Sequence, residues 1–475
     1  MKKLTNILLF TLLISVAMSA QKTKEAVLKK LDSQTEKYGS IAMQIWDLAE
    51  MGYLEEQSSS LLQETLSNEG FTIKKGVANI PTAFIAEYGS GLPIIAILGE
   101  FDALPGLSQQ AIPEKKSTNG DAGHACGHHL FGTASAAAAI SVKQWMQSTK
   151  QKGTIRFYGC PAEEGGGAKV YMAREGLFDD VDIALHWHPG SQNAASAAAA
   201  LANISAKFRF YGVSAHAAGA PEKGRSSLDG VEAMNAMVNM MREHVPQEAR
   251  IHYVITDGGK APNVVPDFAE VYYYSRHYSR EVVRSIFNRI VKAGEGAALG
   301  TGTTMKYEIV NGVHELLPNL TLQKLVHDNL TSIGGITYSP EEKEFADKIA
   351  LSLGQKEADI DRALSIQPYK EEARAYGSTD VGDVSFVVPT VGFGTATWVP
   401  GTSAHSWQAV AAGGTTIGQK GMMVAAKTLT ATAIDLFQNK ELIEKATVEF
   451  NKRRGKDFIY KPLLGNRPPA LDYRK

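Results

Sequence analysis

The sequence predicts an α/β protein: a three-layer catalytic domain with a mostly parallel mixed sheet, and a ferredoxin-like α+β domain inserted into it. Short apolar runs alternate with helical segments, and several of these runs end in polar side chains. A stretch with the order β-α-β-β-α-β interrupts this pattern. The chain has 475 residues, which is more than one hydrophobic core usually holds, so two domains are expected.

Residues 1–20 have the layout of a secretory signal peptide. Lys2 and Lys3 precede an apolar run over residues 7–16, and small residues follow up to Ala20. The apolar run is too short to span a bilayer as an anchor. We therefore expect this segment to be removed and the protein to be exported to the periplasm or the extracellular space.

Residues 21–202 form the first part of the larger domain. Helical spacing over 22–70 is followed by strand patterns over 71–75, 82–87 and 94–98. The third strand runs into GEFDALPG, so Glu100 and Asp102 stand where open α/β sheets place their sites. The cluster DAGHACGHHLF at 121–131 comes next, and an alanine-rich helix over 132–147 follows it.

Two further strands of this part end in candidate site residues. The strand over 154–158 leads to Glu163 and Glu164, and three glycines behind them allow a helix to start closely. The strand over 181–188 ends in HWHP. Alternate strand residues share a face, so His186 and His188 point the same way and either one could reach the site.

The inserted domain covers residues 203–312. Its predicted strands and helices occupy 203–213, 226–244, 250–256, 268–276, 281–298 and 304–310, in the ferredoxin-like order. Residues 313–475 return to the larger domain and form the tail. They contain helices from Leu320, an apolar strand over 385–394 that leads toward His405, and a closing helix over 418–437.

Cys126 and the neighbouring histidines indicate half of a metal site. One thiolate and three imidazoles within six residues are donors that zinc-like divalent ions prefer. The chain has only two cysteines, Cys126 and Cys160, so a four-thiolate structural site is excluded and other ligands must come from elsewhere. Three alternatives stay open: a buried cysteine with capping histidines, a Cys126–Cys160 disulfide, or a Cys126 nucleophile activated by His128 or His129.

The charge balance indicates a small-molecule partner. The chain has 49 basic and 50 acidic residues, so no net field attracts nucleic acid or an anionic membrane. No apolar stretch after the first segment is long enough to span a bilayer.

Eight segments, in this order, carry a family resemblance: GEFDALPGLSQ, HACGHH, PAEEGGG, HWHPG, SAHAAGAPEKGRSSLDG, APNVVPD, GSTDVGDVS and TSAHSW. They resemble the dinuclear metallohydrolases that include carboxypeptidase G, aminoacylases, hippurate hydrolases and indole-acetyl-amino-acid hydrolases. The most similar branch is that of the aminobenzoyl-glutamate hydrolases. The resemblance covers nearly the whole chain after residue 20.

The resemblance implies two divalent metal ions, zinc or manganese, that hold the attacking water and the scissile carbonyl. Its implied ligands are Cys126, His128, Glu164, His188 and His405. His186 is the alternative to His188. Glu163 resembles the general base that moves the proton. Two adjacent glutamates would otherwise be a solvated surface pair.

Other positions resemble supporting groups. Asp102 would orient a ligand, and His216 would reach a partner subunit's site to stabilise the oxyanion. Asn263 and Arg276 would hold the substrate carboxylate. The branch usually has Asp where this chain has His129, and the roles of His129, Glu100 and Asp380 stay open.

We therefore expect a metal-dependent amidohydrolase that separates an acyl or aroyl group from an amino acid, with p-aminobenzoyl-glutamate as the leading substrate. A homodimer through the inserted domain is expected, with a homologous partner subunit as an alternative. A dipeptidase or another N-acyl-amino-acid hydrolase would share the catalytic residues and differ in the pocket. A noncatalytic exported binding protein is a further alternative, although a binder has no need of Glu163.

Overall fold

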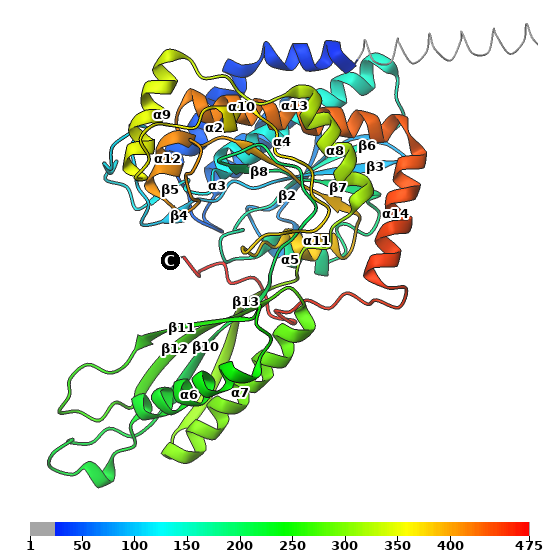
Figure 1. The fold of residues 1–475 in the computed structure, drawn as a ribbon. Helices are drawn as coiled ribbons and strands as arrows, with labels where there is room; N and C mark the ends of the chain where they lie inside the picture. Colours follow the sequence, from blue (N-terminus) through cyan, green and yellow to red (C-terminus); the bar gives the residue numbers. More distant parts are fainter. Residues whose placement is uncertain (1–23, 475) are drawn as a thin grey trace, which may run out of the picture.

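The computed structural model describes residues 24–474, so the expected signal peptide lies outside the described residues. The larger domain is built on a six-stranded mixed sheet (Figure 1). Its strand order is β1 (Thr72–Lys75), β2 (Phe84–Ser90), β6 (Gly153–Gly159), β3 (Ile94–Gly99), β7 (Ile183–Leu185) and β15 (Thr390–Val391). The four strands from β6 to β15 run parallel to one another, whereas β2 pairs antiparallel with both β6 and β1. This sheet confirms the predicted α/β class.

Helices cover both faces of this sheet. Successive residues of β3 point to opposite faces, so they pack in two different cores. Ile95 and Ile97 pack in one core with α4 (His128–Thr149) and α13 (Thr416–Gln438). Ala96 and Leu98 pack in the other core with α5 (Ala168–Arg174) and α11 (Val381–Ser385). The remaining longer helices of this domain are α2 (Thr35–Leu48), α3 (Glu56–Asn68), α8 (Leu320–Ile333), α9 (Pro340–Ser352), α12 (Trp407–Gly413) and α14 (Lys440–Arg454).

The smaller domain projects from the larger one as a separate body (Figure 1). Its elements are β10 (Ala202–Tyr211), α6 (Ser227–Met241), β11 (Arg250–Asp257), β12 (Phe268–His277), α7 (Arg280–Thr301) and β13 (Thr304–Val313). The sheet order β11-β12-β10-β13 is fully antiparallel, as in a ferredoxin-like unit. Buried side chains of α6 and α7 pack on one face of this sheet.

Two strand predictions were wrong in their extent. The run over 385–394 contains the end of helix α11, a turn, and only the short strand β15 before β16 (Gly394–Ala396). A short buried apolar run does not distinguish strand from helix, and Pro389 interrupts this one. The strand predicted over 181–188 ends at Leu185, and His188 starts β8 (His188–Gly190), which pairs with β16.

Across residues 24–474, no helix combines the length and the apolar character needed to cross a bilayer.

Candidate metal centre

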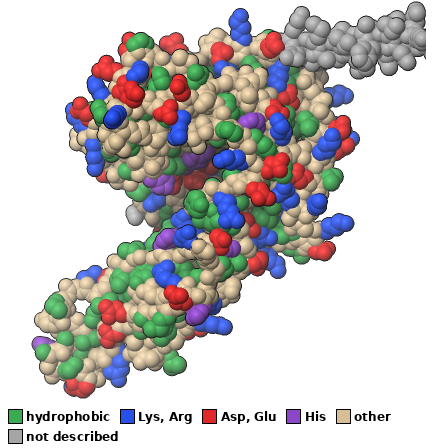
Figure 2. Space-filling view, in the orientation of Figure 1, with side chains coloured by type: hydrophobic (Ala, Val, Ile, Leu, Met, Phe, Trp, Pro, Cys, Tyr) green, Lys and Arg blue, Asp and Glu red, His purple; other side chains and the backbone are tan. Residues whose placement is uncertain are grey.

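The candidate site lies at the carboxyl ends of three neighbouring parallel strands. Glu100 and Asp102 follow β3, the paired glutamates follow β6, and His188 follows β7. Histidine and acidic side chains gather in a hollow of the larger domain that faces the smaller one (Figure 2).

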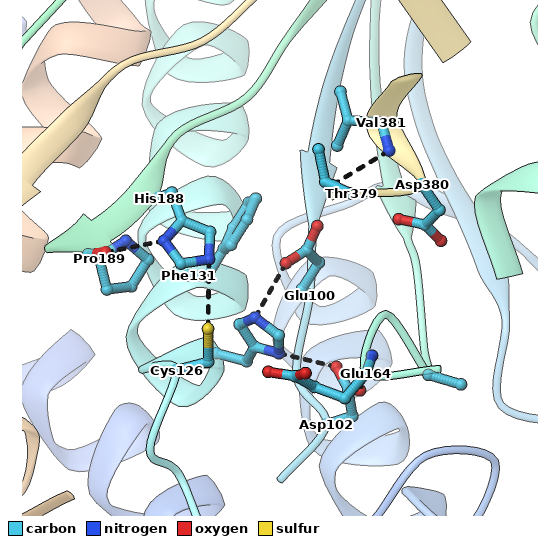
Figure 3. A network of polar contacts seen from close by, with 12 residues as sticks. Glu100, Asp102, Cys126, Phe131, Glu164, His188, Pro189, Thr379, Asp380 and Val381 are labelled. Carbon is cyan, nitrogen blue, oxygen red and sulfur yellow. Dashed lines mark hydrogen bonds and ion pairs between the residues drawn. The ribbon is translucent and has the colours of Figure 1, made fainter. Parts of the chain in front are cut away.

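His128 is the first residue of α4, and its ring is fully buried. Gly127 precedes it with a φ of 73°, and a Cβ at this glycine would lie 2.6 Å from the Pro189 Cβ. The glycine therefore lets the start of α4 approach the strand that carries His188. The ring Nδ1 of His128 donates to the Asp102 Oδ1 at 2.8 Å, and this bond leaves Nε2 free for a ligand. Figure 3 shows the side chains of Glu100, Cys126 and His188 turned toward one another.

Asp102 also ties the two halves of the site together. Its second oxygen, Oδ2, accepts a hydrogen bond from the Glu164 backbone N–H at 2.9 Å. Burial raises the pKa of this carboxyl, but the charge and hydrogen bond of His128 together with the Glu164 N–H bring it below its ordinary value. Asp102 is thus held as a carboxylate that orients one candidate ligand and the backbone of another.

Cys126 and His188 face each other across the site, with 3.5 Å between Sγ and Nε2. The Nδ1 of His188 donates to the Pro189 carbonyl at 2.7 Å, so its Nε2 is the free nitrogen. Burial, and secondarily the charge of Glu164, raises the pKa of the Cys126 thiol. A thiolate at this position therefore requires a cation beside it.

Glu164 and His405 form the outer side of the site. The Glu164 Oε1 lies 3.1 Å from the His405 Nε2. Burial raises the pKa of Glu164, but the hydrogen bond from His405 lowers it below its ordinary value. His405 adopts a φ of 59°, a left-handed conformation that is uncommon for a residue with a side chain and is often found at functional sites.

These residues form overlapping groups whose ligand atoms lie within 4.8 Å of one another. The groups are Cys126–His128–His188, Cys126–Glu164–His405 and Glu100–His128–Glu163. The buried atoms His128 Nε2 and Glu100 Oε2 are 3.1 Å apart but are not aligned as a hydrogen bond, and neither has a hydrogen-bond partner within residues 24–474. Free imidazole nitrogens, a thiol and carboxylates converging on one point suit a divalent metal such as zinc or manganese.

Glu163 belongs to the third of these groups and is absent from the two that contain Cys126. Burial, reinforced by the charges of Glu100 and Glu164, raises its pKa well above the ordinary value. A carboxyl group with a raised pKa can exchange a proton near neutral pH.

Glu100 and Asp380 are joined through a residue that the sequence did not single out. Lys169 is completely buried, with its Nζ 2.7 Å from Glu100 Oε1 and 2.6 Å from Asp380 Oδ1. Asp380 also accepts the backbone N–H of Lys169 at 3.0 Å, so it anchors the first turn of α5. Asp380, whose role the sequence left open, therefore pairs with a buried lysine and holds the start of α5. A lone lysine in an apolar helix carries no sequence signal for such a pair.

Two histidines near the cluster lie outside the ligand groups. His129 points away from the site: its Nε2 donates to the Gly413 carbonyl at 3.0 Å, and its ring packs against His124. His186 Nε2 is buried without a hydrogen-bond partner among the described residues, and a Cβ at Gly392 would lie 2.1 Å from it. The two cysteines are both free, so the disulfide alternative is not formed.

A cavity of about 500 Å³ opens beside the ligand groups. Its wall includes His188 and Glu100 at the site end, and His186. The rest is mainly apolar or small, and includes Phe131, Leu316, Leu317, Phe393 and Trp398.

The structure does not bring all three candidate residues of the smaller domain together. His216 and Asn263 are neighbours at the tip, where the Ala217 N–H donates to the Asn263 carbonyl at 3.0 Å. Arg276 lies at the other end of β12, next to the larger domain. The 10 residues of β12 span about 30 Å at roughly 3.3 Å per residue. The tip residues are therefore remote from the metal groups of their own chain.

Comparisons with known proteins agree with this geometry. The family described as peptidase family M20/M25/M40 matches residues 96–408. One of the subunits of the p-aminobenzoyl-glutamate hydrolase of Escherichia coli (strain K12) is 40% identical over 467 residues, covering 93% of this chain and 97% of that protein. The Xaa-Arg dipeptidase of Mus musculus is 28% identical over 451 residues, covering 92% and 94%.

Among solved structures, a dinuclear metal-binding peptidase of the M20 family from Bacillus subtilis has the same fold. The TM-score is 0.58 at 17% identity, with 86% of this chain and 99% of that chain covered.

Proposed function

The chain belongs to peptidase family M20/M25/M40 and is a metal-dependent hydrolase. We propose that it cleaves the amide bond between an acyl or aroyl group and an amino acid. The leading substrate is p-aminobenzoyl-glutamate, because the relative that is 40% identical carries that substrate in its name. The main support for this proposal is the position of Glu163 at the same sheet edge as the two groups that share Cys126, with His128 common to its own group and one of them.

We propose two divalent ions, zinc or manganese, held by Cys126, His128, Glu164, His188 and His405. Two of the ligand groups share only Cys126, so the remaining four residues divide into two pairs, and this division supports two ions. Bound metals of this kind supply Lewis-acid polarisation of the carbonyl and lower the pKa of water. Asp102 and the Pro189 carbonyl fix the tautomers of the two histidines, so each presents Nε2.

Glu163 then acts as the general base and acid. Its raised pKa suits a carboxylate that takes a proton from the attacking water and returns it to the leaving amide nitrogen. The apolar cavity beside His188 takes the acyl or aroyl group, since its phenylalanine, leucine and tryptophan side chains suit a flat aromatic ring.

We further propose that the active form is a dimer through the smaller domain. His216 and Asn263 sit at the tip of that domain, so they can serve a site only in another chain. Asn263 and Arg276 would then hold one substrate carboxylate from two different subunits. The Escherichia coli relative is named as a subunit, and this supports a homologous partner chain as the alternative to a homodimer. The sequence of residues 1–20 supports export to the periplasm or the extracellular space.

A substrate panel tests this function. Purified protein with zinc or manganese is assayed with p-aminobenzoyl-glutamate, benzoyl-glycine and a dipeptide that ends in arginine. Preferred release of p-aminobenzoate supports the proposal. Preferred cleavage of the dipeptide would assign the chain to the activity named for the mouse relative. No hydrolysis of any amide by the metal-loaded protein would favour a binding protein.

A further inference from the structure

The last described residues of the chain return to the candidate metal centre. After α14 the tail runs along the junction between the two domains and ends beside the larger domain (Figure 1). Arg467 fixes its course, because Nη1 donates to the Val310 carbonyl of β13 at 2.7 Å. Leu463 packs against Gly312, where an added Cβ would lie 2.8 Å from the leucine Cβ.

The end of the tail binds the backbone of a candidate ligand. The Arg474 Nη2 donates to the Glu164 carbonyl at 2.6 Å, and the Tyr473 hydroxyl donates to the same oxygen at 3.2 Å. Among residues 24–474, both hydrogen bonds to this oxygen come from the tail. The Tyr473 ring stands edge-on to Tyr53, with ring centroids 5.5 Å apart.

The loop over 162–167 needs such support. Ala162, Gly165 and Gly167 have φ values of 54°, 102° and 69°, which are uncommon backbone conformations. The Ala162 carbonyl accepts the N–H groups of Gly166 and Gly167 at 3.0 and 2.8 Å, and neither of these turn hydrogen bonds uses the Glu164 carbonyl. On its inner side Asp102 accepts the Glu164 N–H, and on its outer side the tail donates to the Glu164 carbonyl. The Tyr53 hydroxyl donates to the Gly166 carbonyl at 2.8 Å beside this contact.

We propose that Tyr473 and Arg474 are positioning residues that fix the Glu164 peptide and thereby orient both glutamates of the site. This inference rests on the proposed function, in which Glu164 holds metal and Glu163 moves the proton. A guanidinium–carbonyl hydrogen bond is charge-assisted and shorter than a neutral one. Groups that orient a metal ligand typically change metal affinity or activity by about 10- to 100-fold when they are removed.

The test compares Arg474→Ala, Arg474→Lys and Tyr473→Phe with Arg453→Ala. Arg453 is the matched control, because it makes its ion pair with Glu449 on the surface of α14. Zinc retention is measured against a graded chelator, and kcat and KM are measured separately on p-aminobenzoyl-glutamate. We expect Arg474→Ala to weaken zinc retention by about 10-fold and to lower kcat more than it changes KM. Arg474→Lys should recover part of both losses, since lysine keeps a charged donor, and Arg453→Ala should match the parent.

A fall in melting temperature with unchanged zinc retention and kcat would overturn the positioning role, because an anchor that only stabilises the fold has that effect. Parent-like behaviour of all the tail variants in a protein that retains zinc would also overturn it, and would leave the proposed function standing. A parent chain that binds no metal would overturn the proposed function and this inference together.

Discussion

Replacing Lys169 by methionine should destabilise the protein far more than a surface lysine replacement. The lysine is completely buried between Glu100 and Asp380, at 2.7 and 2.6 Å. At an effective dielectric constant of about 20, each contact is worth roughly 6 kcal/mol of Coulomb attraction, which largely offsets the cost of burying the three charges. Methionine fills a similar volume, so the main effect is the loss of the charge.

The loss of stability in the Lys169→Met variant is limited, because a buried carboxylate can take up a proton. Without the lysine, a carboxylate that stays charged is buried and unpaired, and Asp380 will take up a proton instead. Burial already raises the pKa of Asp380 from its ordinary 3.8 to about 6. Relative to an ordinary pKa of 3.8, full protonation at pH 7 costs about 4 kcal/mol at roughly 1.36 kcal/mol per pKa unit, and about 3 kcal/mol of this is already present in the parent, so protonation of Asp380 adds about 1 kcal/mol. Breaking a buried pair usually costs roughly 3–5 kcal/mol, so we expect most of the loss to come from the missing attraction between Lys169 and Glu100.

Urea unfolding of the metal-free protein at pH 7, followed by circular dichroism, measures this loss. The control is Lys420→Met, because Lys420 lies 2.6 Å from Glu342 but has a side chain that is 38% exposed, so its loss should cost below about 1 kcal/mol. The double variant Lys169→Met/Asp380→Asn should regain part of the loss, since it removes one unpaired carboxylate. A Lys169→Met variant no less stable than Lys420→Met would show that the buried ion pairs of Lys169 do not stabilise the fold.

Three further predictions concern catalysis, assembly and pH. The Glu163→Ala variant should keep its metal, measured by elemental analysis, and lose at least about 100-fold in turnover. Full activity of this variant would show that Glu163 is not the general base. Mixing equal amounts of Glu163→Ala and His216→Ala chains should restore some activity if subunits exchange, and no recovery in an exchanging mixture counts against a role in trans. His314 is buried, and burial lowers its pKa from 6.5 to about 4. The folded state thus binds this proton less tightly than the unfolded state. The stability from neutral His314 is present above pH 6.5 and falls by about 3 kcal/mol as the pH drops toward 4. His314→Gln should therefore show a flatter pH dependence of the urea midpoint than the parent, and equal slopes would disprove the prediction.

The parts of the site that lie at strand ends could be predicted from the sequence. Glu100, Glu164 and His188 follow apolar runs, and parallel strands bring their carboxyl ends to one edge, so long separations in sequence become short distances. The inserted domain was predictable for a similar reason, because its six elements have clear periodicity.

Other parts depend on contacts that no local pattern encodes. Lys169 pairs with Asp380 across more than 200 residues, and Arg474 reaches Glu164 across more than 300. Nothing in their neighbouring residues distinguishes either one from an ordinary surface charge. The strand predicted over 385–394 was wrong in its extent for a different reason, since buried apolar residues fit a short helix and a strand equally well.

To test whether the chain is a metal-dependent amidohydrolase, metal content and hydrolysis of p-aminobenzoyl-glutamate are measured on one sample, before and after chelation and after adding metal back. The predicted result is about two metal ions per chain, with activity that falls as they are removed and returns with manganese or zinc. Hydrolysis that continues in metal-free protein but stops when Cys126 is alkylated would contradict a metal-dependent mechanism and indicate a thiol nucleophile.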